Sequence, residues 1–408
     1  MRRCRIAARQ ERYPMKIAFF SNFMNHHQLP LCRELLRLTD GQFTFVAFEP
    51  IDPERLAMGY ADQNALPFVV RAYESEAALA EANALAESCD ALILGSAPHH
   101  YALQRAKNNQ LTFLFSERIH KQHWQEAFLP REFYRAYHAL AHYRGKPYYL
   151  LSASAYAPFD YALHGAFLHK CFRWGYFPAA EPCDIDALMR GKSAASGAGL
   201  QLLWAGRFLD WKHPAAALRA ADALQKAGID FTLTLIGNGE QLPALQSEIA
   251  ARGLQDRVLL PGSMPPEQVR AAMRRADIFL FTSDWQEGWG AVLNEAMNSG
   301  CAVVASHAAG ATPYLVQDGQ NGVIYTSGDQ TALDAAVLAL AQNAARREAL
   351  GRAACRTITE LWNAETAARR LVALCRTLPS TPAYPDGPCS AAPLLLPRKT
   401  YRHKENRL

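Results

Sequence analysis

Short apolar runs alternate with segments of helical spacing along nearly the whole chain. Runs such as Ile17–Ser21 and Ile278–Phe281 are too apolar for a half-exposed strand, so they indicate parallel sheets covered by helices on both faces. The chain is therefore expected to be an α/β protein. The predicted strands are 17–21, 43–48, 68–70, 91–95, 111–115 and 148–152 in the first half, and 200–205, 231–236, 258–260, 278–281, 302–305 and 323–325 in the second.

The length predicts two domains, because 408 residues exceed what one hydrophobic core usually serves. Half of the residues are apolar, which is enough for two cores. Glycine and serine gather near 191–199, which indicates a linker. Prolines recur near the end, which indicates a disordered tail. The expected ranges are a disordered extension at 1–14, a first domain at 15–178, a linker at 179–199, a second domain at 200–358 and a disordered tail at 377–408.

The net charge of +5 is concentrated at the two ends of the chain, so the body between them is slightly acidic. An acidic body argues against nucleic-acid binding. The nine cysteines form no CxxC pair and indicate reduced thiols of a cytoplasmic protein. No apolar run is long enough to span a membrane, and no signal peptide is expected. The basic ends are compatible with peripheral contact with the inner face of the plasma membrane.

Two carboxylates in the second half suit a sugar-nucleotide pocket. Glu287 follows the run 278–281 at a strand-to-helix turn, where ligands of such folds bind. Gly288 and Gly290 beside it would let a bound group approach the backbone N–H groups at the helix start, which favour anions. Glu295 lies further along the same helix, where a carboxylate can accept hydrogen bonds from ribose hydroxyls.

Glu287 and Glu295 form a Glu-x7-Glu pattern, and two further motifs precede it along the chain. Gly206-Arg207 follows a strand and precedes Lys212, and Gly237-Asn-Gly239 follows the next strand. With these three motifs, the C-terminal half resembles the retaining glycosyltransferases of family four. The resemblance implies the GT-B fold, in which two Rossmann-like, doubly wound parallel-sheet domains face a central cleft. It also implies that the helix at 359–376 crosses back to the first domain.

The resemblance also implies roles for individual residues. Arg207 and Lys212 would hold the donor diphosphate, and Glu287 would bind hydroxyls of the donor sugar, with retention of the anomeric configuration. The donor would be a UDP- or GDP-sugar, and no metal or other cofactor is expected. The residues expected to act in catalysis are Glu287, Arg207, Lys212 and Glu117. The expected donor-binding residues are Gly206, Arg207, Lys212, Gly237, Gly239, Glu287, Gly288, Trp289, Gly290, Ala291, Val292 and Glu295.

The first half departs from the family pattern and is expected to bind the acceptor, a saccharide or lipid-linked saccharide. Where the family has a glycine-rich loop, this chain has polar residues, and where many members have a histidine after a strand, it has Ser-Glu-Arg. Asn25 is equally suited to cap a helix, Glu117 to pair with Arg118 or another basic group, and His100 to serve a structural role. The expected acceptor-binding residues are Asn22, Asn25, His26, His100 and Glu117.

Other functions remain open at this point. His138 and His142 lie one helical turn apart, but the sequence offers no third metal ligand beside them. A nicotinamide-dependent oxidoreductase is disfavoured because position 242 is leucine instead of the third glycine of its motif. A non-catalytic nucleotide-sugar-binding protein and a GT-B epimerase would carry the same binding residues. The favoured function is a glycosyltransferase of surface-polysaccharide biosynthesis.

Overall fold

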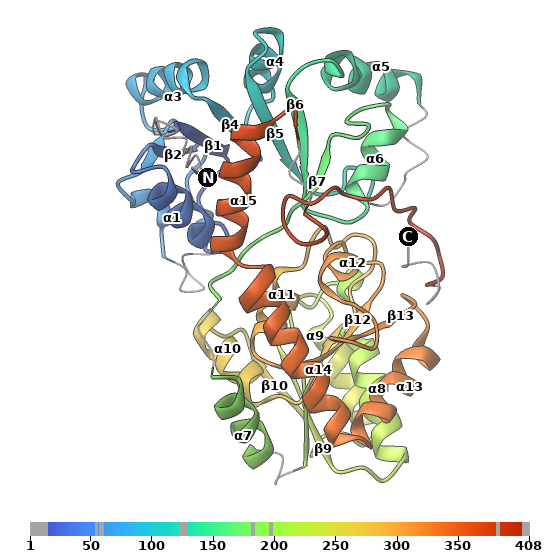
Figure 1. Ribbon diagram of the computed structural model, residues 1–408. Coiled ribbons are helices and arrows are strands. Elements are labelled where there is room, and N and C mark those ends of the chain that lie inside the picture. Colours follow the sequence, from blue (N-terminus) through green and yellow to red (C-terminus); the bar gives the residue numbers. More distant parts are fainter. Residues whose placement is uncertain are drawn as a thin grey trace, which may run out of the picture.

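Two α/β domains, each built on a parallel sheet, lie one above the other in the computed structural model (Figure 1). The structure describes residues 15–53, 56, 61–121, 129–180, 184–195, 199–380 and 384–401. The expected extension at 1–14 lies outside these ranges. The predicted fold class is confirmed. Within the described ranges, no helix combines the length and the apolar character needed to span a bilayer.

The first sheet has seven strands in the order β3-β2-β1-β4-β5-β6-β7. Every residue of β1, β4 and β6 is buried, as expected of strands covered on both faces. The last strand, Cys171–Arg173, was not predicted because it is short and has polar neighbours. The strands are β1 (Ile17–Ser21), β2 (Phe43–Ala47), β3 (Val69–Arg71), β4 (Ala91–Leu94), β5 (Leu111–Ser116), β6 (Tyr148–Ser152) and β7 (Cys171–Arg173).

Helices cover both faces of this sheet. Pro30 stands in the first turn of α1, and Ser75 caps α3 by accepting a hydrogen bond from the amide of Ala78, so both helices begin where the sequence supplies a start signal. The helices of this domain are α1 (Leu29–Leu38), α3 (Glu76–Ser88), α4 (His100–Lys107), α5 (Pro130–Ala139) and α6 (Ala157–Leu163).

The second sheet has six strands in the order β10-β9-β8-β11-β12-β13. The winding reverses between β8 and β11, so the loops after these two neighbouring strands meet at one edge of the sheet. Those loops carry two of the three family-like motifs. The strands are β8 (Leu200–Ala205), β9 (Phe231–Ile236), β10 (Val258–Gly262), β11 (Ile278–Phe281), β12 (Ala302–Ser306) and β13 (Val323–Tyr325).

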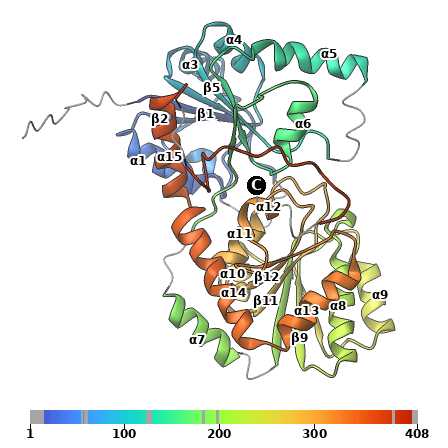
Figure 2. The same cartoon turned by 45° about the vertical axis from the view of Figure 1, so that its right-hand side comes forward.

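The helices of the second domain pack on both faces of its sheet (Figure 2). They are α8 (Pro214–Lys226), α9 (Leu242–Ala251), α10 (Pro266–Arg275), α11 (Ala291–Asn298), α12 (Thr312–Leu315), α13 (Gln330–Ala341) and α14 (Ala344–Arg356).

The expected linker contains a helix that sequence analysis missed. Residues Ile185–Ala195 form α7, which packs against α10 and α14. The ammonium group of Lys192 is buried and donates hydrogen bonds to the carbonyls of Met273 and Ala276. The glycines and serines of 191–199 indicated a linker, so the helical spacing of Ile185, Leu188 and Met189 before them was overlooked.

The segment expected to cross between domains continues α14. It comprises a π-helical turn, Thr357–Leu361, and α15, Ala364–Thr377, which packs against α1 of the first domain (Figure 1). Trp362 lies between them and is fully buried. Its ring stacks with that of Tyr314 at 5.9 Å and also contacts Trp289 and Phe177, so aromatic packing joins the two domains.

The expected disordered tail instead packs against both domains over residues 384–401, and this expectation is corrected. Ser390 accepts a hydrogen bond from the amide of Arg173, and Ala391 bridges Phe172, so the segment pairs with the exposed edge of β7. Further on, the carbonyl of Arg398 accepts from His307 Nε2, and the amide of Tyr401 donates to Thr326. Figure 2 shows this strap, residues 384–401, running from one domain to the other.

Truncation after Ser380 is expected to destabilise the protein. It removes the hydrogen bonds to β7 and the buried side chain of Cys389, which together are worth on the order of 3 kcal/mol. A thermal melt should show the melting temperature falling by several degrees. A chain ending after Tyr401 keeps every described contact of the strap and should melt like the full chain. Equal melting of the two truncated chains would contradict the strap's role.

Candidate active site

The loops after β8 and β11 bring Lys212 and Glu287 into contact. Lys212 Nζ lies 2.6 Å from Glu287 Oε2, and Ser283 Oγ donates a hydrogen bond of 2.9 Å to the same oxygen. The side chains of Lys212 and Glu287 are 14% and 11% exposed, so water screens their attraction only weakly. The two residues that the sequence motifs singled out thus share one site.

Contacts between the two loops hold Lys212 in place. Its carbonyl accepts a hydrogen bond of 2.7 Å from Thr282 Oγ1, and its ammonium group lies 4.5 Å from the ring centroid of Trp211. The next residue, His213, has a left-handed backbone and an Nε2 that lies 3.2 Å from Asp284 Oδ2. The backbone at Lys212 is therefore held in a fixed turn just before α8.

Gly237 and Gly239, two of the expected donor-binding glycines, are packing positions in this structure. A side chain on Gly237 would collide with the carbonyl of Gly206, and one on Gly239 would collide with the backbone of Phe208. These glycines let the loops after β8 and β9 lie against each other. The side chain of Arg207 stands exposed between them, and no hydrogen bond or ion pair joins that side chain to the described part of the chain.

The turn that leads into α11 faces the first domain. A Cβ on Gly288 would collide with the carboxylate of Glu117. Gly290 has φ 90° and precedes α11, while Ala291 and Val292 are half-buried in its first turn. The side chain of Trp289 lies in the buried core, where Nε1 donates to Asn294, so only the backbone of Trp289 is left to meet a donor.

Glu295 lies on α11 against the first domain. Its Oε1 is 3.7 Å from Arg270 Nη1, and its side chain is 12% exposed. Burial raises the pKa of Glu295 to about 7, although the Arg270 guanidinium acts in the opposite direction. One ligand atom each of His26, His27 and Glu295 lie within 4.8 Å of one another. The helix of the second domain thus meets the loop that follows β1.

The loop after β1 is held by its own asparagines. Asn25 Oδ1 accepts hydrogen bonds from the amides of His27 and Gln28, at 3.0 and 3.1 Å, and so closes a turn just before α1. The N-cap of α1 is Gln28, which makes no side-chain cap, so Asn25 does not take the helix-capping role that the sequence left open. Asn22 accepts from the neighbouring Ser21 side chain and, through its carbonyl, from the amides of Phe48 and Glu49. Of the expected acceptor residues in this loop, His26 is the one placed at the domain interface.

His100 lies away from the other expected acceptor-binding residues. It is exposed at the start of α4, where its ring contacts that of Tyr101 with centroids 4.1 Å apart. It lines a surface hollow of about 300 Å³ with residues of α3 and α4. Because Pro98 and His99 turn the chain into α4, His100 points to the outer helical layer instead of the interface.

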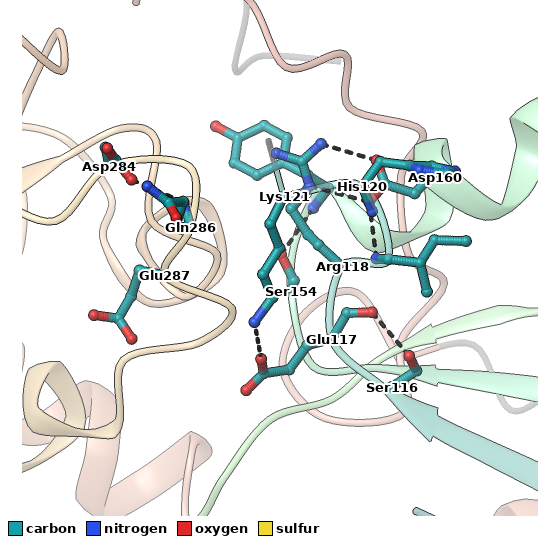
Figure 3. A network of polar contacts seen from close by, with 12 residues as sticks. Ser116, Glu117, Arg118, His120, Lys121, Ser154, Asp160, Asp284, Gln286 and Glu287 are labelled. Atoms are coloured by element: carbon teal, nitrogen blue, oxygen red, sulfur yellow. Dashed lines mark hydrogen bonds and ion pairs between the residues drawn. The ribbon is translucent and has the colours of Figure 1, made fainter. Parts of the chain in front are cut away.

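An ion pair that sequence analysis missed holds the loop after β5. Arg118 donates to both carboxylate oxygens of Asp160, at 3.1 and 2.9 Å, and their side chains are 3% and 0% exposed. Asp160 Oδ2 also accepts from the amides of Ile119 and His120 (Figure 3). Arg118 thus pairs with Asp160, and Glu117 pairs with another basic group, Lys121, which the sequence left open beside Arg118. Asp160 was hidden as a partner because it lies on α6, far along the sequence.

Arg118 also reaches the second domain. Its guanidinium lies 5.7 Å from the ring centroid of Trp285, in the loop that carries Glu287, and 5.6 Å from that of Tyr156. The Tyr156 hydroxyl donates a hydrogen bond of 2.6 Å to the carbonyl of His307, and the amide of Ala155 donates to Gly310. These contacts fix loops of the first domain against loops of the second.

The same loop presents a second ion pair toward Glu287. Glu117 Oε2 lies 2.8 Å from Lys121 Nζ, and these side chains are 29% and 38% exposed. Figure 3 shows Glu117 and Lys121 on the side of the loop that faces Glu287. Sequence analysis selected Glu117 and missed Lys121, because no periodic element links the two positions.

The second domain is similar in sequence to known glycosyltransferases. Residues 187–357 match the sequence model of the family described as glycosyl transferases group 1. The chain is 34% identical over 151 residues to the amylovoran biosynthesis glycosyltransferase AmsK of Erwinia amylovora, a stretch covering 36% of this chain and 37% of that protein. It is 30% identical over 163 residues, or 38% of this chain and 42% of the relative, to a GDP-mannose-dependent mannosyltransferase acting on phosphatidylinositol monomannoside in Mycolicibacterium smegmatis. The matches thus span well under half of these relatives.

Solved structures match over both domains. The crystal structure of Anabaena Alr3699/HepE in complex with UDP superposes with a TM-score of 0.64 at 17% identity, covering 89% of this chain and all of that one. The same protein has also been solved with UDP-glucose, and that structure gives a TM-score of 0.60. At this level of identity, the likeness establishes the two-domain GT-B fold.

Replacing Asp160 with alanine is expected to lower the free energy of unfolding by roughly 3–5 kcal/mol, because Arg118 would remain buried without its counter-ion. Urea unfolding measures the change. Glu34→Ala, which breaks an exposed pair with Arg37, serves as the control and should cost less than about 1 kcal/mol. A similar small loss in both variants would contradict the assignment.

Stability should depend on pH through Glu295. Its pKa of about 7 in the folded protein lies above the ordinary 4.5, so the folded state keeps a proton that the unfolded state has lost. Unfolding free energy should therefore fall as pH rises toward 7, by up to about 1.4 kcal/mol per pH unit.

Glu295→Gln removes this contribution, while Arg270, His26 and His27, which surround the carboxyl group, are retained. Thermal melts of both proteins measure the effect. The melting temperature of the glutamine variant should exceed that of the wild type by more at about pH 8 than at about pH 5. Parallel pH profiles would show that Glu295 is ionised throughout this range.

Proposed function

We propose, from the premise that residues 187–357 belong to the glycosyl transferases group 1 family, that this chain is a retaining glycosyltransferase. It moves a sugar from a nucleoside-diphosphate sugar to a saccharide or lipid-linked saccharide. The observation that carries this proposal is the contact between Lys212 and Glu287 where the loops after β8 and β11 meet. A cation and a carboxylate in contact suit a donor that carries phosphate beside sugar hydroxyls.

Lys212 acts on the leaving group. Departure of the nucleoside diphosphate concentrates negative charge on its phosphates, and a fixed cation in a poorly solvated site stabilises that charge. Arg207 stands exposed in the neighbouring loop and supplies a second cation. When a diphosphate draws Lys212 away, Glu287 is released to accept hydrogen bonds from the donor sugar, and Ser283 keeps it oriented.

The reaction retains the anomeric configuration in this proposal. The acceptor hydroxyl attacks the anomeric carbon from the face that the phosphate leaves, and its proton passes to the departing phosphate oxygen. Lys212, Arg207 and the backbone amides at the start of α11 carry the developing charge, so no metal is assigned to this step.

The donor is a UDP- or GDP-sugar. UDP is supported by the HepE structures, and GDP by the mannosyltransferase of Mycolicibacterium smegmatis. Glu295 binds the ribose of either nucleotide. Glu117 and Lys121 face Glu287 from the first domain and bind the acceptor. We place the reaction in surface-polysaccharide synthesis, which the similarity to AmsK, a glycosyltransferase of amylovoran biosynthesis, supports, and on the cytoplasmic side of the membrane.

Lys212→Ala is expected to lower the turnover number by about 10²–10³, because one stabilising group for the departing charge is lost. Lys226→Ala, on the exposed side of α8, is the matched control and should retain full turnover. Release of UDP or GDP from a panel of donor sugars measures both variants, and thermal melting checks that both are folded. Near-normal turnover of Lys212→Ala would contradict the mechanism.

The same assay separates the other functions. A glycosyltransferase releases nucleoside diphosphate in proportion to a glycosylated product, and NMR of that product should show the anomeric configuration of the donor. A non-catalytic binding protein would bind the donor and release nothing when acceptor is added. An epimerase would convert the donor sugar without any acceptor. Either result would overturn the proposal.

A further inference from the structure

Two histidines and one glutamate from different domains meet beside the proposed donor site. His26 and His27 belong to the loop after β1, and Glu295 belongs to α11. One ligand atom from each of the three lies within 4.8 Å of the others. All three residues are half-buried, so the cluster is shielded while remaining open to a small ion.

The backbone around this cluster is already fixed. Asn25 Oδ1 accepts hydrogen bonds from the amides of His27 and Gln28, which sets the turn that carries both imidazoles. On the other side, Asn294 Nδ2 donates to the carbonyl of Tyr176, and the Tyr176 ring lies edge-on to His27 with centroids 6.4 Å apart. Tyr176 thus contacts both the histidine loop and the helix that carries Glu295.

Two imidazoles and one carboxylate form a donor set typical of zinc. With bonds of about 2.1 Å, ligand atoms around a tetrahedral zinc ion lie about 3.4 Å apart. The ligand atoms therefore need to approach one another by at most about 1.4 Å for zinc to bind. Arg270 lies 3.7 Å from Glu295 and opposes a cation, so binding is expected to be weaker than at a structural zinc site.

We propose that His26, His27 and Glu295 form a site for a divalent transition metal, with Zn²⁺ as the preferred ion. A bound ion ties the loop after β1 to α11 and so holds the two domains together. It also occupies Glu295, the residue assigned to the donor ribose, and therefore competes with the nucleotide. This competition rests on the proposed function, whereas the metal site itself does not.

Zinc binding to the full-length, metal-free, reduced protein tests the site directly. Isothermal titration with Zn²⁺ in the absence of nucleotide should detect one saturable site. His26→Ala, His27→Ala and Glu295→Gln should each weaken it at least about tenfold. His138→Ala is the matched control: it removes a histidine of the His138–His142 pair, whose ring centroids are 6.3 Å apart, and should leave zinc affinity unchanged.

The outcomes are distinguishable. Thermal melting of each variant excludes unfolding as the cause of lost binding. Equal zinc affinity in the wild type and the three site variants would overturn the metal site. That result would leave the proposed function intact, because nucleotide binding is measured separately without zinc.

A second titration tests the competition. Saturating Zn²⁺ should weaken the affinity for UDP or GDP, whichever binds better, at least about tenfold in the wild type and not in His26→Ala. An unchanged nucleotide affinity in zinc-saturated wild type would overturn the competition. Absence of binding by either nucleotide without zinc would instead count against the proposed function.

Discussion

The reversal of winding within each parallel sheet is the constraint on which the site depends. In the second sheet it lies between β8 and β11, and it forces the loops with Lys212 and Glu287 together, although they are distant in sequence. In the first sheet the reversal lies between β1 and β4, and the loop after β1 carries His26 and His27. The interface is therefore built from the carboxyl ends of strands on both sides.

The domains are joined by several different kinds of contact. Aromatic packing around Trp362 closes one side, the strap of residues 384–401 spans another, and Arg118 meets Trp285 beside the site itself. The buried pair with Asp160 leaves Arg118 only one arrangement, because any other would leave a charge without a partner. The loop after β5 is thus positioned by electrostatics, and the loops that carry Lys212 and Glu287 by strand order.

Short sequence patterns predicted the features of the structure that residues close together in sequence determine. The predicted strands followed from apolar runs, and the meeting of Lys212 with Glu287 followed from motifs at strand ends. The pairing of Arg118 with Asp160 and the approach of His26 to Glu295 depend on how distant elements pack, which no short pattern records. Composition gave two wrong predictions. Glycine and serine at 191–199 indicated a linker in place of α7, and the prolines indicated disorder in the strap, which is ordered by pairing with β7.

The position of α15 has a consequence for biosynthesis. Its apolar face, including Ala367, Ala368 and Leu371, packs against α1, so the last helix of the chain completes the core of the domain that is made first. As the polypeptide leaves the ribosome, the nascent first domain has to wait for the whole second domain before that surface is covered. Until then the apolar face of α1 stays exposed to solvent, as hydrophobic surface does in a partly folded protein.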